Sequence, residues 1–112
     1  MGNSKTDGSD IDEYLLQAAK LGDSEVVRDL LSKGANIDAR AAKGETALIF
    51  AAKFGHLDIV RLLILAGAAT DIKDELGYDA YHAAMYSGDQ RGATLEPYNT
   101  IMQALRQVAP KA

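Results

Sequence analysis

Apolar residues recur along the chain at the spacing of short amphipathic helices. In the middle of the chain Leu48, Ala51 and Ala52 fall at positions i, i+3 and i+4, which is one face of a helix. A second stripe with helical periodicity follows, made of Ile59, Val60, Leu63 and Ile64. This pattern predicts two short helices joined by a tight turn, over about residues 47–54 and 57–66.

The same pattern repeats at an interval of 33 residues. Gly22, Gly55 and Gly88 are separated by this interval, as are Gly34 and Gly67. It also separates Leu15 from Leu48, Ala18 from Ala51 and Ala84, Val27 from Val60, Leu30 from Leu63, and Asp38 from Asp71. One such unit cannot bury its apolar faces alone, so neighbouring units must stack. The further helices are expected near residues 10–20, 24–33, 80–87 and 98–108.

Turn residues support these helix boundaries. Thr46 is placed to cap the helix that follows it, and Gly55 separates the two helices of the middle unit. Gly67 is expected to end the second helix in a left-handed turn, which glycine adopts without steric cost. Four larger residues at helical core spacing are expected to be packed inside: Tyr14, Phe50, Tyr81 and Met85.

The middle unit, residues 44–74, resembles the ankyrin repeat. The matching positions are Gly44, Thr46, Leu48, Ala51, Ala52, Gly55, His56, Ile59, Val60, Leu62, Leu63, Gly67 and Ala68. Ala47 and Ile49 depart from the proline and histidine usual there. The resemblance implies an all-α solenoid of three stacked helix-turn-helix units with short β-turn fingers.

The domain organisation follows from the period. We expect a flexible tail over residues 1–9 and a single domain over residues 10–109, with repeats at about 11–40, 41–74 and 75–109. In the third repeat the apolar set returns late, as Ile101, Met102 and Leu105, which is offset by 42 residues from the middle repeat. That offset predicts nine inserted residues within 89–97.

The inserted segment allows two interpretations. Long loops on a rigid scaffold often carry function, so Arg91 and Leu95 are candidate partner contacts. Alternatively, Leu95 and Tyr98 cap the last repeat. Pro97 is expected in the first turn of the last helix, and Pro110 is expected to stop that helix.

Composition argues against several classes of function. The chain has 112 residues, a formal net charge of −4 and no cysteine. Without a Lys/Arg cluster it is a poor candidate for binding nucleic acid. His56 and His82 occupy ankyrin pattern positions and are interpreted as structural, so no metal site, cofactor or catalytic set is expected. No signal peptide or run of about 20 apolar residues is visible, so the cytoplasm is the default location.

The remaining candidates lie on the surface. Ankyrin proteins usually bind partner proteins along a concave face built from turn tips and the ends of first helices. The matching positions chosen here are Leu21, Lys43, Glu45, Lys53, Phe54, Leu76, Tyr78 and Tyr86, with Ala42, Glu75, Ser87, Asp12 and Lys20 beside them. The apolar members are expected to form one exposed patch, and such patches mark interaction sites. A competing interpretation is that the loop after Gly88 covers part of it.

We therefore expect a monomeric, non-catalytic module that binds another protein. Residues 1–6 match M-G-x-x-x-[ST], so a membrane-tethered adaptor that is N-myristoylated at Gly2 is one competing hypothesis, and membrane contact is expected only in that case. A second is an accessory or regulatory subunit of an enzyme. A third is a protein that self-associates through Phe54 and Tyr86.

Overall fold

The computed structural model describes residues 9–91 and 96–108. These residues form six α-helices and no strand. In chain order the helices are α1 (Ser9–Leu21), α2 (Ser24–Ser32), α3 (Ala47–Lys53), α4 (Leu57–Leu65), α5 (Ala80–Arg91) and α6 (Tyr98–Arg106). The prediction of an all-α repeat is confirmed.

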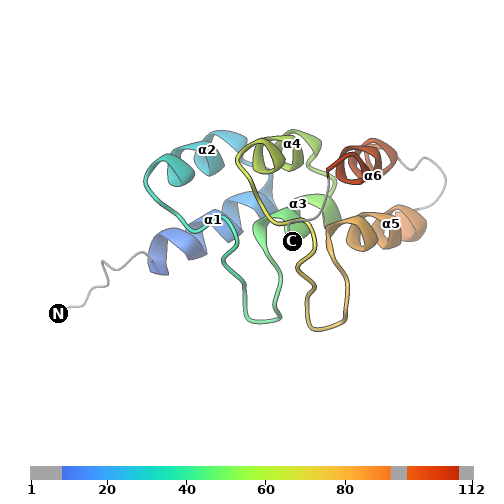
Figure 1. Cartoon of the computed structure of the whole chain (residues 1–112), viewed down its shortest axis with the longest axis horizontal. Coiled ribbons are helices and arrows are strands. Elements are labelled where there is room, and N and C mark those ends of the chain that lie inside the picture. Colours follow the sequence, from blue (N-terminus) through green and yellow to red (C-terminus); the bar gives the residue numbers. More distant parts are fainter. Residues whose placement is uncertain (1–8, 92–95, 109–112) are drawn as a thin grey trace.

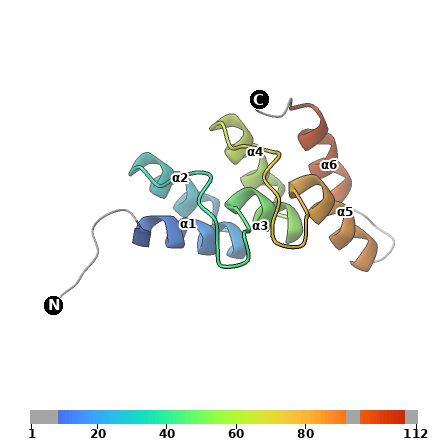
Figure 2. The ribbon, with the colours of Figure 1, turned by 60° about the horizontal axis from the view of Figure 1, so that its bottom comes forward.

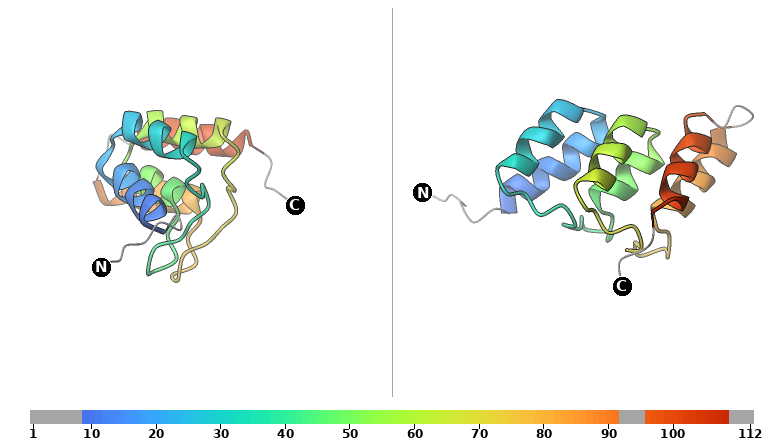
Figure 3. Two further views of the ribbon diagram at one scale, coloured as in Figure 1. Left: turned by 90° about the vertical axis from the view of Figure 1, so that its left-hand side faces the viewer. Right: turned by 45° about the horizontal axis from the view of Figure 1, so that its top comes forward.

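The helices form three antiparallel pairs stacked in two layers (Figures 1 and 3). The inner layer contains α1, α3 and α5, with α3 packed between the other two. The outer layer contains α2, α4 and α6, with α4 packed between its neighbours. Two loops project beyond the inner layer, side by side, from the chain between α2 and α3 and between α4 and α5 (Figure 2).

The core lies between the two layers. All six residues from Ala47 to Ala52 are buried in α3, because this helix has a neighbour on each side and α4 behind it. Small alanines at the contact let the helices approach closely. In α6, Ile101 and Leu105 are buried as Ile59 and Leu63 are in α4.

The turn signals act as predicted. Thr46 Oγ1 accepts a hydrogen bond from the Ile49 amide at 3.2 Å and caps α3. Gly55 and Gly67 follow α3 and α4 with φ of +79° and +94°. These left-handed values explain why the repeat needs glycine at both turns.

The glycine turns of one repeat are covered by the next. A Cβ atom on Gly22 would lie 2.7 Å from Cε1 of His56, whose Nε2 lies 3.1 Å from the Lys20 carbonyl oxygen. A Cβ atom on Gly55 would lie 3.2 Å from the hydroxyl of Tyr98. Tyr98 therefore occupies, in the third pair, the place that His56 occupies in the second.

The third pair differs from the prediction. The expected helix over 80–87 instead runs through Gly88 to Arg91, because glycine permits a break without requiring one and α6 begins only at Tyr98. Pro97 precedes α6 as its N-cap instead of lying in its first turn. The last helix ends at Arg106, and Pro110, which was expected to stop it, lies outside the described residues.

Two predicted core residues are exposed. Tyr14 has 61% of its surface exposed, whereas Ala47 at the equivalent position is buried. Position 14 faces the side of α1 where the described residues provide no preceding helix. Met85, which is 40% exposed, lies on α5, after which the described chain has no further inner-layer helix. Phe50 is buried and Tyr81 packs against the core, as predicted.

Candidate functional site

The two projecting loops form the base of the candidate site. Residues 40–46 are called finger 1 and residues 73–79 finger 2. In finger 1 the Ala41 amide donates to the Glu45 carbonyl at 2.8 Å, and an isolated antiparallel bridge joins Arg40 and Thr46. In finger 2 the Asp74 amide donates to the Tyr78 carbonyl at 3.0 Å. Each finger is therefore a hydrogen-bonded hairpin of defined shape.

The fingers are also tied to each other. The Arg40 guanidinium donates through Nε to the Gly44 carbonyl at 3.1 Å and through Nη2 to the Lys73 carbonyl at 2.5 Å. The Glu75 amide donates to the Lys43 carbonyl at 3.0 Å. These bonds fix the spacing of the two fingers, so the side chains they carry stand on a preorganised surface.

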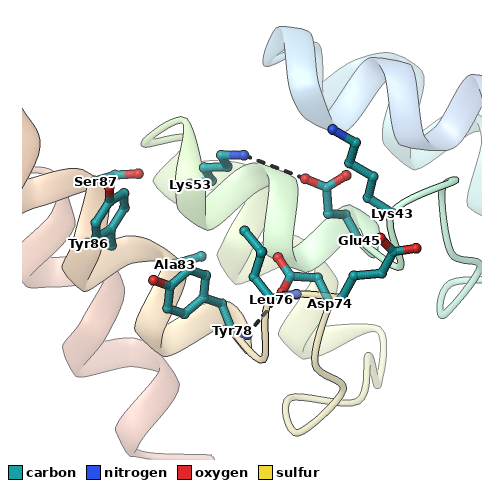
Figure 4. A pocket seen from close by; sticks show the side chains of 10 residues that line it. Lys43, Glu45, Lys53, Asp74, Leu76, Tyr78, Ala83, Tyr86 and Ser87 are labelled. Carbon is teal, nitrogen blue, oxygen red and sulfur yellow. Dashed lines mark hydrogen bonds and ion pairs between the residues drawn. The ribbon is translucent and has the colours of Figure 1, made fainter.

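A hollow of about 330 Å³ opens between the two fingers, α3 and α5 (Figure 4). We call it the tyrosine hollow. Its lining residues are Lys43, Glu45, Lys53, Asp74, Glu75, Leu76, Tyr78, Ala83, Tyr86 and Ser87. The rings of Tyr78 and Tyr86 stack with centroids 5.8 Å apart and planes inclined by 21°. Leu76 and Tyr86 are 80% and 51% exposed, so this apolar wall faces solvent.

Asp74 sets the shape of finger 2. One carboxylate oxygen, Oδ1, accepts from the Leu76 amide at 2.9 Å and from the Tyr78 amide at 3.0 Å. Gly77 closes the tip with φ of +89°. Asp74 was not among the predicted site residues, although Asp at the first and Gly at the fourth position of Asp74–Gly77 is a turn signature that identifies it.

A second hollow adjoins the first on the side of α1. We call it the phenylalanine hollow, and the two together the groove. It is lined by Glu13, Leu16, Gln17, Lys20, Ala41, Ala42, Lys43, Glu45, Phe50, Lys53 and Phe54. Phe50 and Phe54 stack with ring centroids 6.4 Å apart. Lys20 Nζ lies 5.5 Å from the centre of the Phe50 ring, and Lys53 Nζ lies 5.7 Å from that of Phe54.

An ion pair stands where the two hollows meet. Lys53 Nζ is 3.5 Å from Glu45 Oε2 (Figure 4), and both residues line both hollows, together with Lys43. The lysine side chain is 44% exposed, so the pair adds little to the free energy of folding. The pair forms a polar boundary between the stacked tyrosines on one side and the stacked phenylalanines on the other.

The structure brings most of the predicted surface residues together. Eight of them line the tyrosine hollow, namely Lys43, Glu45, Lys53, Glu75, Leu76, Tyr78, Tyr86 and Ser87. Phe54 is half-buried and lines the phenylalanine hollow instead. Leu21 is exposed at the end of α1 but lines neither hollow.

The predicted positions outside the two fingers have different outcomes. Asp12 is structural, because its Oδ1 accepts from the Asn36 amide at 2.7 Å. Arg91 is the last residue of α5, and the placement of its side chain lies outside what the structure describes. Leu95 and Gly2 lie outside the described residues.

Further residues of the phenylalanine hollow were missed by sequence reasoning. Glu13 and Gln17 precede Lys20 on one face of α1, at helical spacing, and this periodicity identifies them. Phe50 was interpreted as packing alone, but it also lines the hollow. In the tyrosine hollow, Ala83 was missed because an alanine carries no functional signal in a sequence.

The two histidines serve the scaffold. His56 Nε2 contacts the Lys20 carbonyl oxygen across the first two repeats. His82 Nδ1 lies 2.7 Å from Asp79 Oδ1, which also accepts from the His82 amide at the start of α5.

Within residues 9–91 and 96–108, no three His, Cys, Asp or Glu side chains are grouped to hold a metal ion. No helix in this part is long and apolar enough to cross a membrane.

A separate hollow lies in the outer layer, on other elements. Residues of α2 and α4 line it, among them Arg28, Arg61 and Leu65. Leu65 is 88% exposed, slightly more than Leu76 of the groove. It therefore provides a control position of the same residue type on the opposite layer.

A family model described as ankyrin repeats (3 copies) matches residues 15–95, which is more than half of the 112 residues. A search among curated proteins gives no match.

Proposed function

The chain belongs to the ankyrin repeat family, and on that premise we propose that it is a non-catalytic module whose partner protein binds in the groove. Ankyrin repeats are in general protein–protein interaction modules, and their scaffold does not fix the partner. The proposal for this chain rests on the chemistry of the groove.

The observation that carries the proposal is the solvent-facing apolar wall of the tyrosine hollow. Leu76 is 80% exposed, and it lines the hollow together with the stacked pair Tyr78 and Tyr86. Aromatic residues are favoured anchors at protein interfaces. Burying a leucine of this kind contributes about 1.5–3 kcal/mol, so a partner that covers it gains affinity.

Preorganisation supports the same conclusion. The carboxylate of Asp74 and the Arg40 bonds hold the fingers in place without a partner. Little ordering of the fingers is then required on binding, which lowers the entropic cost of association.

Affinity capture from a native lysate tests the proposal. The bait proteins are wild type, the groove variant Leu76→Ala/Tyr86→Ala, and the outer-layer control Leu65→Ala. Leu65 and Leu76 are largely exposed and Tyr86 is half exposed, so melting temperatures should agree closely. We expect at least one protein retained by wild type and by Leu65→Ala and lost by the groove variant. A partner lost only by Leu65→Ala would contradict the groove proposal.

The captured proteins and the native chain itself also distinguish three narrower hypotheses: an enzyme subunit, a myristoylated adaptor and a self-associating protein. An enzyme among the retained proteins would identify the chain as an accessory or regulatory subunit. The intact mass of native protein shows whether Gly2 carries a myristoyl group, and light scattering distinguishes the predicted monomer from a self-associating form. Retention of a labelled copy of the same chain, lost in the groove variant, would favour self-association.

A further inference from the structure

One position of each inner-layer helix carries a lysine in the first two repeats and a tyrosine in the third. Lys20, Lys53 and Tyr86 occupy the same register, 33 residues apart, on α1, α3 and α5. All three line the groove. The groove is therefore cationic at the first two repeats and aromatic at the third.

The charges of the phenylalanine hollow do not cancel. Three lysines line it against two glutamates, Glu13 and Glu45. Lys53 is paired with Glu45 at 3.5 Å. Among the described residues, no ion pair within 4.0 Å involves Lys20 or Lys43. Lys20 Nζ instead lies over the Phe50 ring, and because Lys20 is exposed its ammonium group can still contact a ligand.

The tyrosine hollow has the opposite balance. Two lysines line it, against Glu45, Asp74 and Glu75. Asp74 is engaged by backbone amides of finger 2, but Glu75 is exposed at the rim. A carboxylate of a ligand would be repelled beside Glu75, whereas an apolar side chain would contact Leu76, Tyr78 and Tyr86.

We propose that the partner presents an acidic–apolar peptide segment: a large apolar side chain occupies the tyrosine hollow, and acidic residues on one side of it lie over Lys20 and Lys43. The segment is thereby bound in a single direction along the repeats. Each lysine ammonium group acts as a point charge and can bind one carboxylate of the peptide, whereas an arginine would favour a bidentate contact. This inference rests on the proposed function, since it specifies the partner of the same groove.

Selection of peptides from a random dodecamer phage library on immobilised wild-type protein tests the inference. We expect enrichment of sequences with one large apolar or aromatic residue and two or more Asp or Glu on one side of it. Recovered peptides are then synthesised with a fluorescent label, and their Kd values are measured by anisotropy at several salt concentrations. Wild-type affinity should fall as salt rises, because the lysines are exposed.

Two matched double variants show which cations contribute to peptide affinity. Lys20→Gln/Lys43→Gln removes two cations from the groove, and Arg28→Gln/Arg61→Gln removes two from the outer hollow. We expect the lysine variant to weaken peptide binding by about tenfold at low salt, as two exposed charge contacts allow. The arginine variant should change the Kd by less than about twofold, because Arg28 and Arg61 line the outer hollow and do not contact a peptide in the groove.

The possible failures are distinguishable. If peptides depend on Leu76 and Tyr86 but are neither enriched in acidic residues nor weakened by the lysine variant, the acidic–apolar inference is wrong and the groove function stands. If the arginine variant weakens binding as much as the lysine variant, the charge effect is nonspecific and the inference is also wrong. If no selected peptide depends on Leu76 or Tyr86, the inference and the proposed groove both fail.

Discussion

Gly22 satisfies two requirements at once, and substitution can separate them. Its φ is +88°, and a Cβ atom would lie 2.7 Å from the His56 ring. Gly34 has φ of +97° with nothing within 4 Å of a Cβ atom. We expect Gly34→Ala to lower the free energy of unfolding by about 1 kcal/mol, the cost of a left-handed alanine. Gly22→Ala should cost about 1–3 kcal/mol more, because His56 must move.

Urea denaturation of the two variants and wild type measures this difference. If Gly22→Ala and Gly34→Ala lower the free energy of unfolding equally, the His56 ring moves aside at little cost. Its contact across the first two repeats then contributes little to stability.

For single residues, the sequence predicts the position of a side chain well where the repeat register determines it. Lys43, Glu45, Leu76 and Tyr86 line the tyrosine hollow because the family pattern and the 33-residue interval locate them on fingers and helix ends. Tyr14 was predicted incorrectly, because its burial depends on a neighbouring helix that the described chain does not provide. Periodicity identifies a face of a helix but not what covers it.

The start of α3 depends on one side chain. Thr46 is buried, and its hydroxyl accepts from the Ile49 amide at 3.2 Å. We expect Thr46→Ala to lower the free energy of unfolding by about 1 kcal/mol, as loss of a helix cap does. Thr46→Ser retains the hydroxyl and should cost less. Thermal melting followed by circular dichroism compares the two, and equal losses would mean that the methyl group, and not the cap, stabilises the helix.

Finger 2 depends on Asp74 in a similar way. Removing its carboxylate in Asp74→Ala leaves the amides of Leu76 and Tyr78 without their acceptor. We expect hydrogen exchange at these two amides to accelerate by about tenfold or more, the equivalent of one lost hydrogen bond, with global stability nearly unchanged. Glu75→Ala is the control, since no side-chain bond from Glu75 holds the finger. Equal exchange in both variants would show that the Asp74 carboxylate does not shape finger 2.

Element lengths were less predictable than element identity. Gly88 shares the register of Gly22 and Gly55, so a break was expected there, yet α5 continues to Arg91. A glycine costs about 1 kcal/mol inside a helix, which packing against α6 can offset. Whether the chain turns at such a glycine depends on where the next helix begins, and the sequence alone does not fix that position.

The molecule as a whole is expected to unfold in one step, because each helix pair buries its apolar face only against its neighbours. Leu63 is fully buried in the central pair, so Leu63→Ala should lower the free energy of unfolding by about 2–5 kcal/mol. Circular dichroism reports on all helices, whereas four of the five tyrosines lie between positions 78 and 98. Both probes should give the same midpoint in wild type and variant. Separate midpoints would show that the third pair unfolds independently.

The central claim is that the groove binds a partner protein, and amide hydrogen exchange of the protein with and without its captured partner tests it without any substitution. We expect slower exchange on binding at residues 41–45 and 74–78, in the two fingers. Exchange in the outer-layer helices α2 and α4 should remain unchanged. Protection confined to α2 and α4, with unchanged exchange in both fingers, would place the partner on the outer layer and contradict the account.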